Sequence, residues 1–275
     1  MFRIVASDLD GTLLTPNHRL TPFAKKILKL LTDHKIHFIF ATGRHHTNVI
    51  EIRDNLKINS YMITSNGARI HNDDGKLIAS YNLETTIVSD LLGVAHYDSE
   101  IITNVFHNDQ WLINRSISNQ NYFTNGYESN YYVYQKNTLS LDKICKIYFT
   151  SNNYQRLLSL EKELNARWNH HVNISFSLPT CLEVMPGGVS KGHALAQVVK
   201  SLGYQLKDCI SFGDGMNDQE MLSMTGKGCI MSNAQQRLKD TLPLLEIIGS
   251  NKDDAVPHYL KRIYLNKIPN IALIK

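Results

Sequence analysis

The chain has 275 residues, of which 43% are hydrophobic, enough for one large or two moderate domains with a well-formed core. Its 29 basic and 25 acidic residues leave a formal charge of +4, and the basic residues are scattered, so we expect no nucleic-acid or membrane partner. No apolar run reaches the roughly 18 residues of a spanning helix, and the first residues carry no signal-peptide pattern. The composition therefore predicts a soluble, cytoplasmic globular protein. The four cysteines show no C-x-x-C spacing and are expected to be reduced and buried.

Strands and helices alternate over the first 66 residues. Apolar runs at 3–7, 37–41 and 61–64 predict buried strands, each followed by a polar loop. Residues 21–34 carry apolar side chains on one helical face and lysines on the other, and a second helix is expected at 46–56. Strand, polar loop and helix in repetition are typical of a parallel sheet with crossover helices.

This rhythm changes in the middle of the chain. An Asn-Asp-Asp-Gly turn at 72–75 predicts a hairpin. Residues 83–186 then read as helix, strand pair, strand, helix and strand pair, which indicates a separate α+β domain inserted into the first. Within it, residues 119–137 are rich in Asn and Tyr without periodicity and are expected to be a loop or a poorly ordered stretch.

The parallel rhythm returns after residue 186. Helices are predicted at 191–202 and 252–264, with strands between them. The predicted fold class is therefore α/β, a Rossmann-like parallel-sheet core formed by residues 1–82 and 187–264 with an inserted domain at 83–186. The tail at 265–275 receives no role.

Polar loops follow several of the predicted parallel strands. Because ligands of such sheets bind at the carboxyl ends of the strands, these loops are expected to surround one crevice. They contain carboxylates, hydroxyl and amide side chains and glycines, and a lysine at the start of a helix can point at the same place. The segments are residues 8–12, 42–44, 65–67 and 213–218, together with Lys191.

This set of side chains suits phosphate chemistry. Clustered carboxylates repel one another, so a hard divalent cation such as Mg²⁺ is their natural partner. A lysine, a hydroxyl and backbone N–H groups suit a phosphate dianion. Because no Ser-His or Cys-His pair is evident, an aspartate is the most economical nucleophile, which would give an aspartyl-phosphate intermediate with the aspartate two residues on as acid and base.

The motifs D-x-D-G-T at 8–12, Thr-Gly-Arg at 42–44, Gly-Val-Ser-Lys-Gly around Lys191 and G-D-G-x-N-D at 213–218 resemble the haloacid dehalogenase (HAD) phosphatases. The order of the motifs and the large insert resemble the Cof-type subgroup. The resemblance implies a HAD core with a cap domain, Asp8 as nucleophile and Asp10 as acid/base. It further implies phosphate or substrate contacts from Leu9, Thr12, Thr42, Gly43, Lys191 and Asn217. The implied Mg²⁺ ligands and their support are Asp8, the Asp10 carbonyl, Asp214 and Asp218.

Some further runs, such as Ala-Thr-Gly-Arg-His-His and Cys-Leu-Glu-Val-Met, resemble bacterial pyridoxal phosphate phosphatases of this subgroup, which also accept sugar phosphates. The expected substrate is therefore a small phosphorylated metabolite, pyridoxal 5′-phosphate or a sugar phosphate. The insert is expected to open and close over the cleft, with hinges near residues 82 and 186–188, and to select the substrate.

Alternatives stay open at this point. A phosphotransferase or mutase would pass the aspartyl phosphate to a sugar instead of water, and a phosphate sensor would use the same core without catalysis. Residues 65–67 either line the pocket or form only a turn, and Glu183 faces either the cleft or a hinge partner. Arg44 is expected at the surface, and Trp111 and Trp168 in the core. The sequence gives no oligomeric state.

Overall fold

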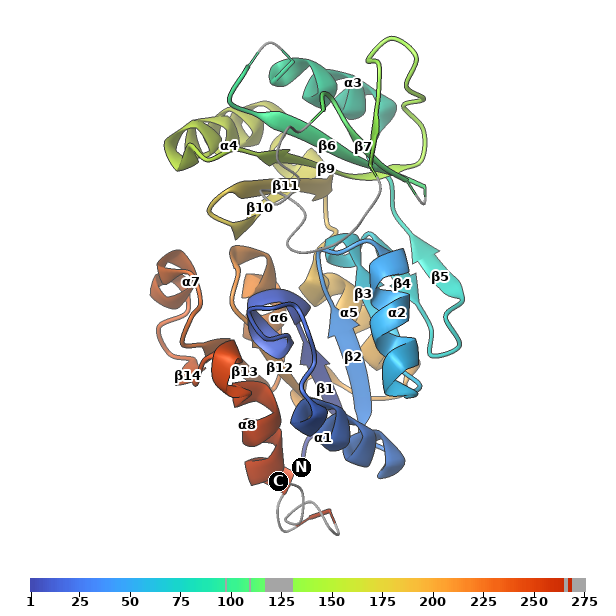
Figure 1. Ribbon diagram of the computed structural model, residues 1–275, viewed down its shortest axis with the longest axis vertical. Coiled ribbons are helices and arrows are strands. Elements are labelled where there is room, and N and C mark those ends of the chain that lie inside the picture. Colours follow the sequence, from blue (N-terminus) through green and yellow to red (C-terminus); the bar gives the residue numbers. More distant parts are fainter. Residues whose placement is uncertain (97, 109, 117–130, 265–266, 269–275) are drawn as a thin grey trace. The chain divides into compact units, whose positions relative to one another are not determined.

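The computed structural model describes residues 1–96, 98–108, 110–116, 131–264 and 267–268. The chain forms two units, Met1–Ile78 with Lys191–Lys275 and Ala79–Ser190 (Figure 1). The first unit is thus built from both ends of the chain, and the second from the segment between them.

The first unit contains an eight-stranded sheet in the order β14-β13-β12-β1-β2-β3-β4-β5. The pairs from β14 to β3 are all parallel, whereas β4 runs antiparallel to β3. Because β1 pairs with β2 on one side and with β12 on the other, the chain leaves β1 at a point where the strand order reverses, which is where ligands bind in such sheets. The strands are β1 (Ile4–Ser7), β2 (His37–Ala41), β3 (Tyr61–Thr64), β4 (Arg69–His71), β5 (Leu77–Ser80), β12 (Cys209–Gly213), β13 (Lys227–Met231) and β14 (Glu246–Ile248).

Helices cover this sheet and supply its core. α1 begins after Thr21, whose hydroxyl accepts a hydrogen bond from the Ala24 N–H, and its buried residues recur at helical spacing. α1 packs against α8, and both join the strand side chains Phe38 and Phe212 in one hydrophobic cluster, while α5 packs against α6. The helices are α1 (Pro22–Asp33), α2 (His46–Leu56), α5 (Lys191–Ser201), α6 (Gln219–Met224), α7 (Gln236–Thr241) and α8 (Ala255–Tyr264).

In its described residues the second unit contains a six-stranded sheet in the order β10-β11-β9-β6-β7-β8 and the α-helices α3 and α4. Its neighbouring strands are antiparallel except for the parallel pair β7 and β8. On the sheet the buried side chains Lys146 and Glu183 form an ion pair of 2.7 Å. The elements are α3 (Thr85–Val94), β6 (Ile102–His107), β7 (Gln110–Ile113), β8 (Tyr131–Val133), β9 (Ile144–Thr150), α4 (Tyr154–Trp168), β10 (Val172–Leu178) and β11 (Cys181–Pro186).

The predicted α/β class is confirmed, with three differences in its elements. β8 lies in the stretch 119–137 that was expected to be a loop, because Tyr-Tyr-Val extends the sheet next to β7; residues 117–130 fall outside the described part. α7 was missed because its six residues contain a single buried apolar side chain, Leu238. α8 begins at Ala255, three residues later than expected, because Asp254 has a left-handed backbone (φ 52°).

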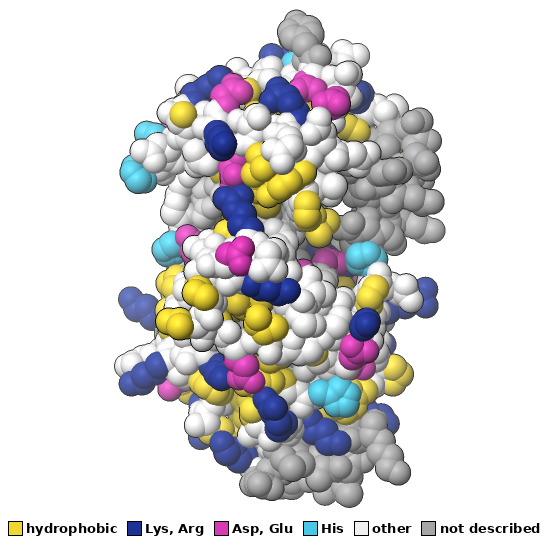
Figure 2. Space-filling model, turned by 90° about the vertical axis from the view of Figure 1, so that its left-hand side faces the viewer, with side chains coloured by type: hydrophobic (Ala, Val, Ile, Leu, Met, Phe, Trp, Pro, Cys, Tyr) yellow, Lys and Arg dark blue, Asp and Glu magenta, His cyan; other side chains and the backbone are white. Residues whose placement is uncertain are grey.

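The surface and the cysteines agree with the composition. On the face drawn in Figure 2, Lys and Arg side chains lie among acidic and uncharged ones. All four cysteines are free and buried, as predicted. Among the described helices, none has the length and apolar character needed to cross a membrane. The tail at 265–275, to which the sequence analysis assigns no role, is described only at residues 267–268.

Candidate active site

The loop after β1 places the first aspartate at the edge of the sheet. The backbone N–H of Asp8 donates to the Phe212 carbonyl at 3.0 Å, which continues the pairing with β12 by one residue. The chain then turns at Gly11 with φ 75°, and a Cβ atom at this position would overlap the Asp214 carboxylate. Glycine is therefore required here both for the backbone angle and for the approach of the two loops.

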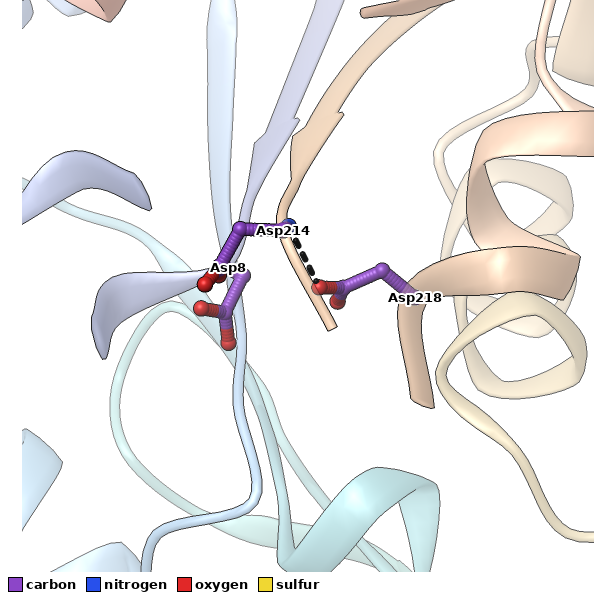
Figure 3. A group of neighbouring side chains, drawn as sticks. All are labelled: Asp8, Asp214 and Asp218. Atoms are coloured by element: carbon purple, nitrogen blue, oxygen red, sulfur yellow. Dashed lines mark hydrogen bonds between the residues drawn. The ribbon is translucent and has the colours of Figure 1, made fainter. Parts of the chain in front are cut away.

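The loop after β12 brings two further carboxylates. Both backbone N–H groups at positions 214 and 215 donate to Oδ2 of Asp218 at 3.0 Å, which fixes this carboxylate inside the loop. The Thr12 hydroxyl donates to Oδ1 of Asp214 at 2.9 Å and so joins the loops after β1 and β12. Carboxylate oxygens of Asp8, Asp214 and Asp218 lie within 4.8 Å of one another (Figure 3).

Lys191, the first residue of α5, provides the cation among these carboxylates. Its Nζ atom donates to Oδ1 of Asp8 at 2.6 Å and to Oδ1 of Asp218 at 2.8 Å, and the side chain is only 1% exposed. Burial alone would lower the pKa of Lys191, but the charges of Asp218 and Asp8 outweigh it and raise the pKa. The lysine is therefore charged at neutral pH.

One lysine does not balance three carboxylates. Burial raises the pKa of Asp8 to about 7; Lys191 opposes this shift, and the charges of Asp218 and Asp10 add to it. Burial, with the charges of Asp8 and Asp218, also raises the pKa of Asp214 well above its usual value. A divalent cation between the oxygens would remove this repulsion, so the donor set fits a hard metal ion such as Mg²⁺.

Two side chains, those of Arg44 and His18, contact the carboxylate of Asp10. Arg44 donates from Nε to Oδ2 at 2.6 Å and from Nη2 to Oδ1 at 2.5 Å, and His18 Nδ1 lies 2.8 Å from Oδ1. Burial acts to raise the pKa of Asp10, but the hydrogen bond from His18 and the charge of Arg44 outweigh it, and the pKa is lowered. The carboxylate form of Asp10 is thus favoured.

The loops after β2 and β3 lie side by side through backbone hydrogen bonds. The Thr42 hydroxyl accepts from the Arg44 N–H at 3.2 Å, and the Asn66 N–H donates to the Thr42 carbonyl at 3.0 Å. Asn217 Nδ2 donates to Oδ1 of Asn66 at 3.0 Å, which connects this pair of loops to the loop after β12. Ser65 and Asn66 both have left-handed backbones, with φ of 48° and 55°. Strain of this kind is frequent at functional sites.

The sequence-predicted site residues fall into three groups. Direct side-chain contacts join Asp8, Thr12, Lys191, Asp214 and Asp218. Asp10 and Thr42 both contact Arg44, Asn217 contacts Asn66, and Gly43 is half-buried between Thr42 and Arg44 in the chain. The Leu9 side chain is packed in the hydrophobic cluster, so only the backbone of Leu9 is left to contact a ligand.

Two features differ from the sequence analysis. The surface position expected for Arg44 is wrong, because its side chain is 6% exposed and paired with Asp10. His18 was not predicted, and a lone histidine in a turn gives no signal that could have found it. Glu183, which was left open, pairs with Lys146 inside the second unit, and Trp111 is buried as expected.

Comparison with known proteins gives matches over nearly the whole chain. The family model described as "haloacid dehalogenase-like hydrolase" matches residues 5–260. A Buchnera aphidicola subsp. Schizaphis graminum protein named "Putative phosphatase" is 43% identical over 275 residues, which cover 100% of this chain and 99% of the relative. An HMP-PP phosphatase of Serratia proteamaculans is 34% identical and covers 95% of each chain. The solved structure of a haloacid dehalogenase-like hydrolase from B. subtilis superposes with a TM-score of 0.84 at 23% identity, covering 95% of this chain and 99% of the other.

Proposed function

Since the chain belongs to the haloacid dehalogenase-like hydrolases, we propose that it is a Mg²⁺-dependent phosphatase that hydrolyses small phosphorylated metabolites through an aspartyl phosphate on Asp8. The observation that carries this proposal is the contact of Lys191 with Asp8 and Asp218, beside Asp214. This arrangement combines a fixed carboxylate nucleophile, a buried cation and a set of oxygen donors in one place.

In the first step an oxygen of Asp8 attacks the phosphorus atom of the substrate. The bond between phosphorus and the ester oxygen breaks, and that oxygen takes a proton from Asp10 as the alcohol leaves. Lys191, Thr42 and the backbone N–H groups after Asp8 and Thr42 hold the phosphoryl oxygens and balance their charge. The backbone N–H of Asp8 donates to the Phe212 carbonyl and so fixes this residue at the end of β1. This fixed position supports an in-line attack on the phosphorus atom.

In the second step a water molecule gives a proton to Asp10 and attacks the phosphorus atom, and the bond between phosphorus and the Asp8 carboxylate breaks. The base role suits the surroundings of Asp10, because the hydrogen bond from His18 and the charge of Arg44 lower its pKa against the effect of burial and so favour the carboxylate. The acid role in the first step requires Asp10 to carry a proton. We therefore propose that Asp10 gives up its contact with Arg44 when substrate binds.

The side chains of Asp8 and Asp214 and the carbonyl of Asp10 would hold Mg²⁺. Asp218 would support the site by its hydrogen bonds to the backbone at positions 214 and 215 and to Lys191. When bound, Mg²⁺ supplies charge neutralisation between the carboxylates and the phosphoryl group.

For the substrate we propose a class of compounds with three candidates. Pyridoxal 5′-phosphate and sugar phosphates follow from the sequence resemblance, and relatives at 34% to 36% identity are named HMP-PP phosphatases, which adds HMP-PP as a candidate. We propose that residues 83–186 act as the cap that selects among them and that the enzyme works in the cytoplasm, where such metabolites occur.

Phosphate release from a panel of substrates tests the proposal. The panel contains pyridoxal 5′-phosphate, hexose phosphates, nucleotides and HMP-PP, each with Mg²⁺ or EDTA, and the proteins are wild type, Asp8→Asn and the control Asp33→Asn on the exposed side of α1. We expect Mg²⁺-dependent release that falls by roughly 10³-fold or more in Asp8→Asn alone. Phosphate release by Asp8→Asn at the wild-type rate would refute the assignment of Asp8 as the nucleophile.

The same panel separates the two alternatives. A phosphotransferase would release little phosphate until a sugar acceptor is added and would then form a new phosphate ester. A sensor would bind a phosphorylated compound without turnover in the presence of Mg²⁺.

A further inference from the structure

Three histidine rings lie in contact in the first unit, outside the carboxylate cluster. His45 and His46 stand at the start of α2, with ring centroids 4.4 Å apart. His71 of β4 stacks on His46, with centroids 4.9 Å apart and an angle of 27° between the rings. The catalytic steps proposed above use none of these three rings.

The surroundings of His71 favour negative charge. The side chain is only 5% exposed, and within the described part of the chain its Nδ1 atom is buried without a hydrogen-bond partner. The pKa of His71 is lowered to about 4, chiefly by burial, with smaller contributions from His46, Arg69, His45 and Arg53. A buried polar atom without a partner costs free energy, so a ligand that can hydrogen-bond here would be stabilised.

The first turn of α2 adds donors of the same kind. This helix has 11 residues, and the side chain of His45, which precedes it, makes no capping hydrogen bond to its backbone; its Nδ1 atom lies 3.0 Å from the Thr47 hydroxyl oxygen. The N–H groups at the start of a helix and the positive end of its dipole attract anions. The three rings are not arranged around a metal ion, because within the described residues only Asp8, Asp214 and Asp218 form a group close enough to share one.

The cluster adjoins, along the chain, the loop after β2 that belongs to the candidate active site. Arg44, which precedes His45 directly, makes the ion pair with Asp10, and its carbonyl accepts from the Ser65 N–H at 2.9 Å. Thr42, a proposed phosphate ligand, lies three residues before His45 in the same loop.

We propose that His45, His46 and His71 with the first turn of α2 bind a second anionic group of the substrate, separate from the phosphoryl group that is transferred. The assignment of this anionic group to a substrate rests on the function proposed above, whereas the anion-binding site itself is inferred from the histidine cluster. The second group is a further phosphate or a carboxylate, since either offers oxygens that accept from imidazole and backbone N–H groups.

Binding of non-hydrolysable phosphonates, measured by calorimetry in the presence of Mg²⁺, tests this site. Methylphosphonate carries one anionic group, methylenediphosphonate carries two, and phosphonoacetate replaces the second by a carboxylate. We expect the wild type to bind at least one of the two-anion probes about tenfold more tightly than methylphosphonate.

The variants His46→Ala and His71→Leu should reduce this preference to below about threefold while leaving the affinity for methylphosphonate within about twofold. His34→Ala at the end of α1 is the matched control and should keep the preference. If the variants lose the preference for methylenediphosphonate, the second group is a phosphate; if they lose the preference for phosphonoacetate, it is a carboxylate. His46 is half-buried, so His46→Ala decides the result if His71→Leu does not fold.

Loss of the preference in either folded variant supports the second anion site. The proposal is overturned if the wild type shows no preference, if every folded variant keeps it, or if methylphosphonate binding falls equally. These outcomes are independent of catalysis: a protein that releases no phosphate but shows the preference would refute the proposed function and leave the anion site standing.

Discussion

Replacement of Lys191 by methionine is expected to lower the free energy of unfolding strongly in the absence of metal. The lysine is 1% exposed and donates to two buried carboxylates at 2.6 and 2.8 Å. Removing one partner of a buried ion pair leaves the other charge uncompensated and costs about 3–5 kcal/mol. Because two carboxylates lose the same partner here, we expect a loss at the upper end of this range, measured by urea unfolding at pH 8 with EDTA.

The exposed pair of Lys29 and Asp33 on α1 provides the control. Lys29 is 57% exposed, so Lys29→Met should change the free energy of unfolding by less than about 0.5 kcal/mol. In the double variant Lys191→Met/Asp218→Asn the loss should be smaller than for Lys191→Met, since one uncompensated charge is gone. A loss below about 1 kcal/mol for Lys191→Met would refute the view that this lysine holds the carboxylates together.

Three further predictions concern the two units separately. Gly11→Ala should destabilise the protein more than Gly203→Ala in urea unfolding, because both glycines have φ near 75° but only a Cβ at Gly11 would overlap the Asp214 carboxylate; equal losses would contradict this. Lys146→Met should cost about 3 kcal/mol by leaving Glu183 buried and charged, and adding Glu183→Leu should recover most of it, which thermal unfolding can check. Mg²⁺ at 100 times its Kd should stabilise the protein by about 2.7 kcal/mol, and an identical melting temperature in Mg²⁺ and in EDTA would oppose a metal site.

The sequence predicts the fold and its family well. The apolar runs that became β2 and β3 and the amphipathic pattern that became α1 are strong local signals, and their predicted bounds agree with the structure to within one residue. The resemblance to HAD phosphatases is confirmed by the match over residues 5–260, and the assignment to the phosphatase class agrees with the names of the relatives. Short elements such as α7 were missed because tertiary contacts, not local pattern, hold them in place.

Within the candidate site, the sequence motifs point to residues that the structure brings together, but they do not predict the contacts between them. Asp8, Lys191 and Asp214 stand in motifs with fixed spacing, and the parallel strand ends explain why they meet. The contact of Asn217 with Asn66 was not predictable, because it joins loops 151 residues apart and depends on the left-handed backbone at Ser65 and Asn66.

The pairing of Arg44 with Asp10 changes what the resemblance alone would suggest. An arginine at the start of a helix is commonly solvated, yet here its guanidinium makes two hydrogen bonds to the carboxylate two residues after Asp8. Such a bidentate pair stabilises the charged form of Asp10, which suits the activation of water but opposes donation of a proton to the leaving group. For both steps to run on one residue, the pair must open and close once in each turnover. In the proposed mechanism Arg44 would therefore act as a positioning residue whose contact with Asp10 separates the acid step from the base step. Its neighbour His45 belongs to the histidine cluster that we propose binds a second anionic group of the substrate.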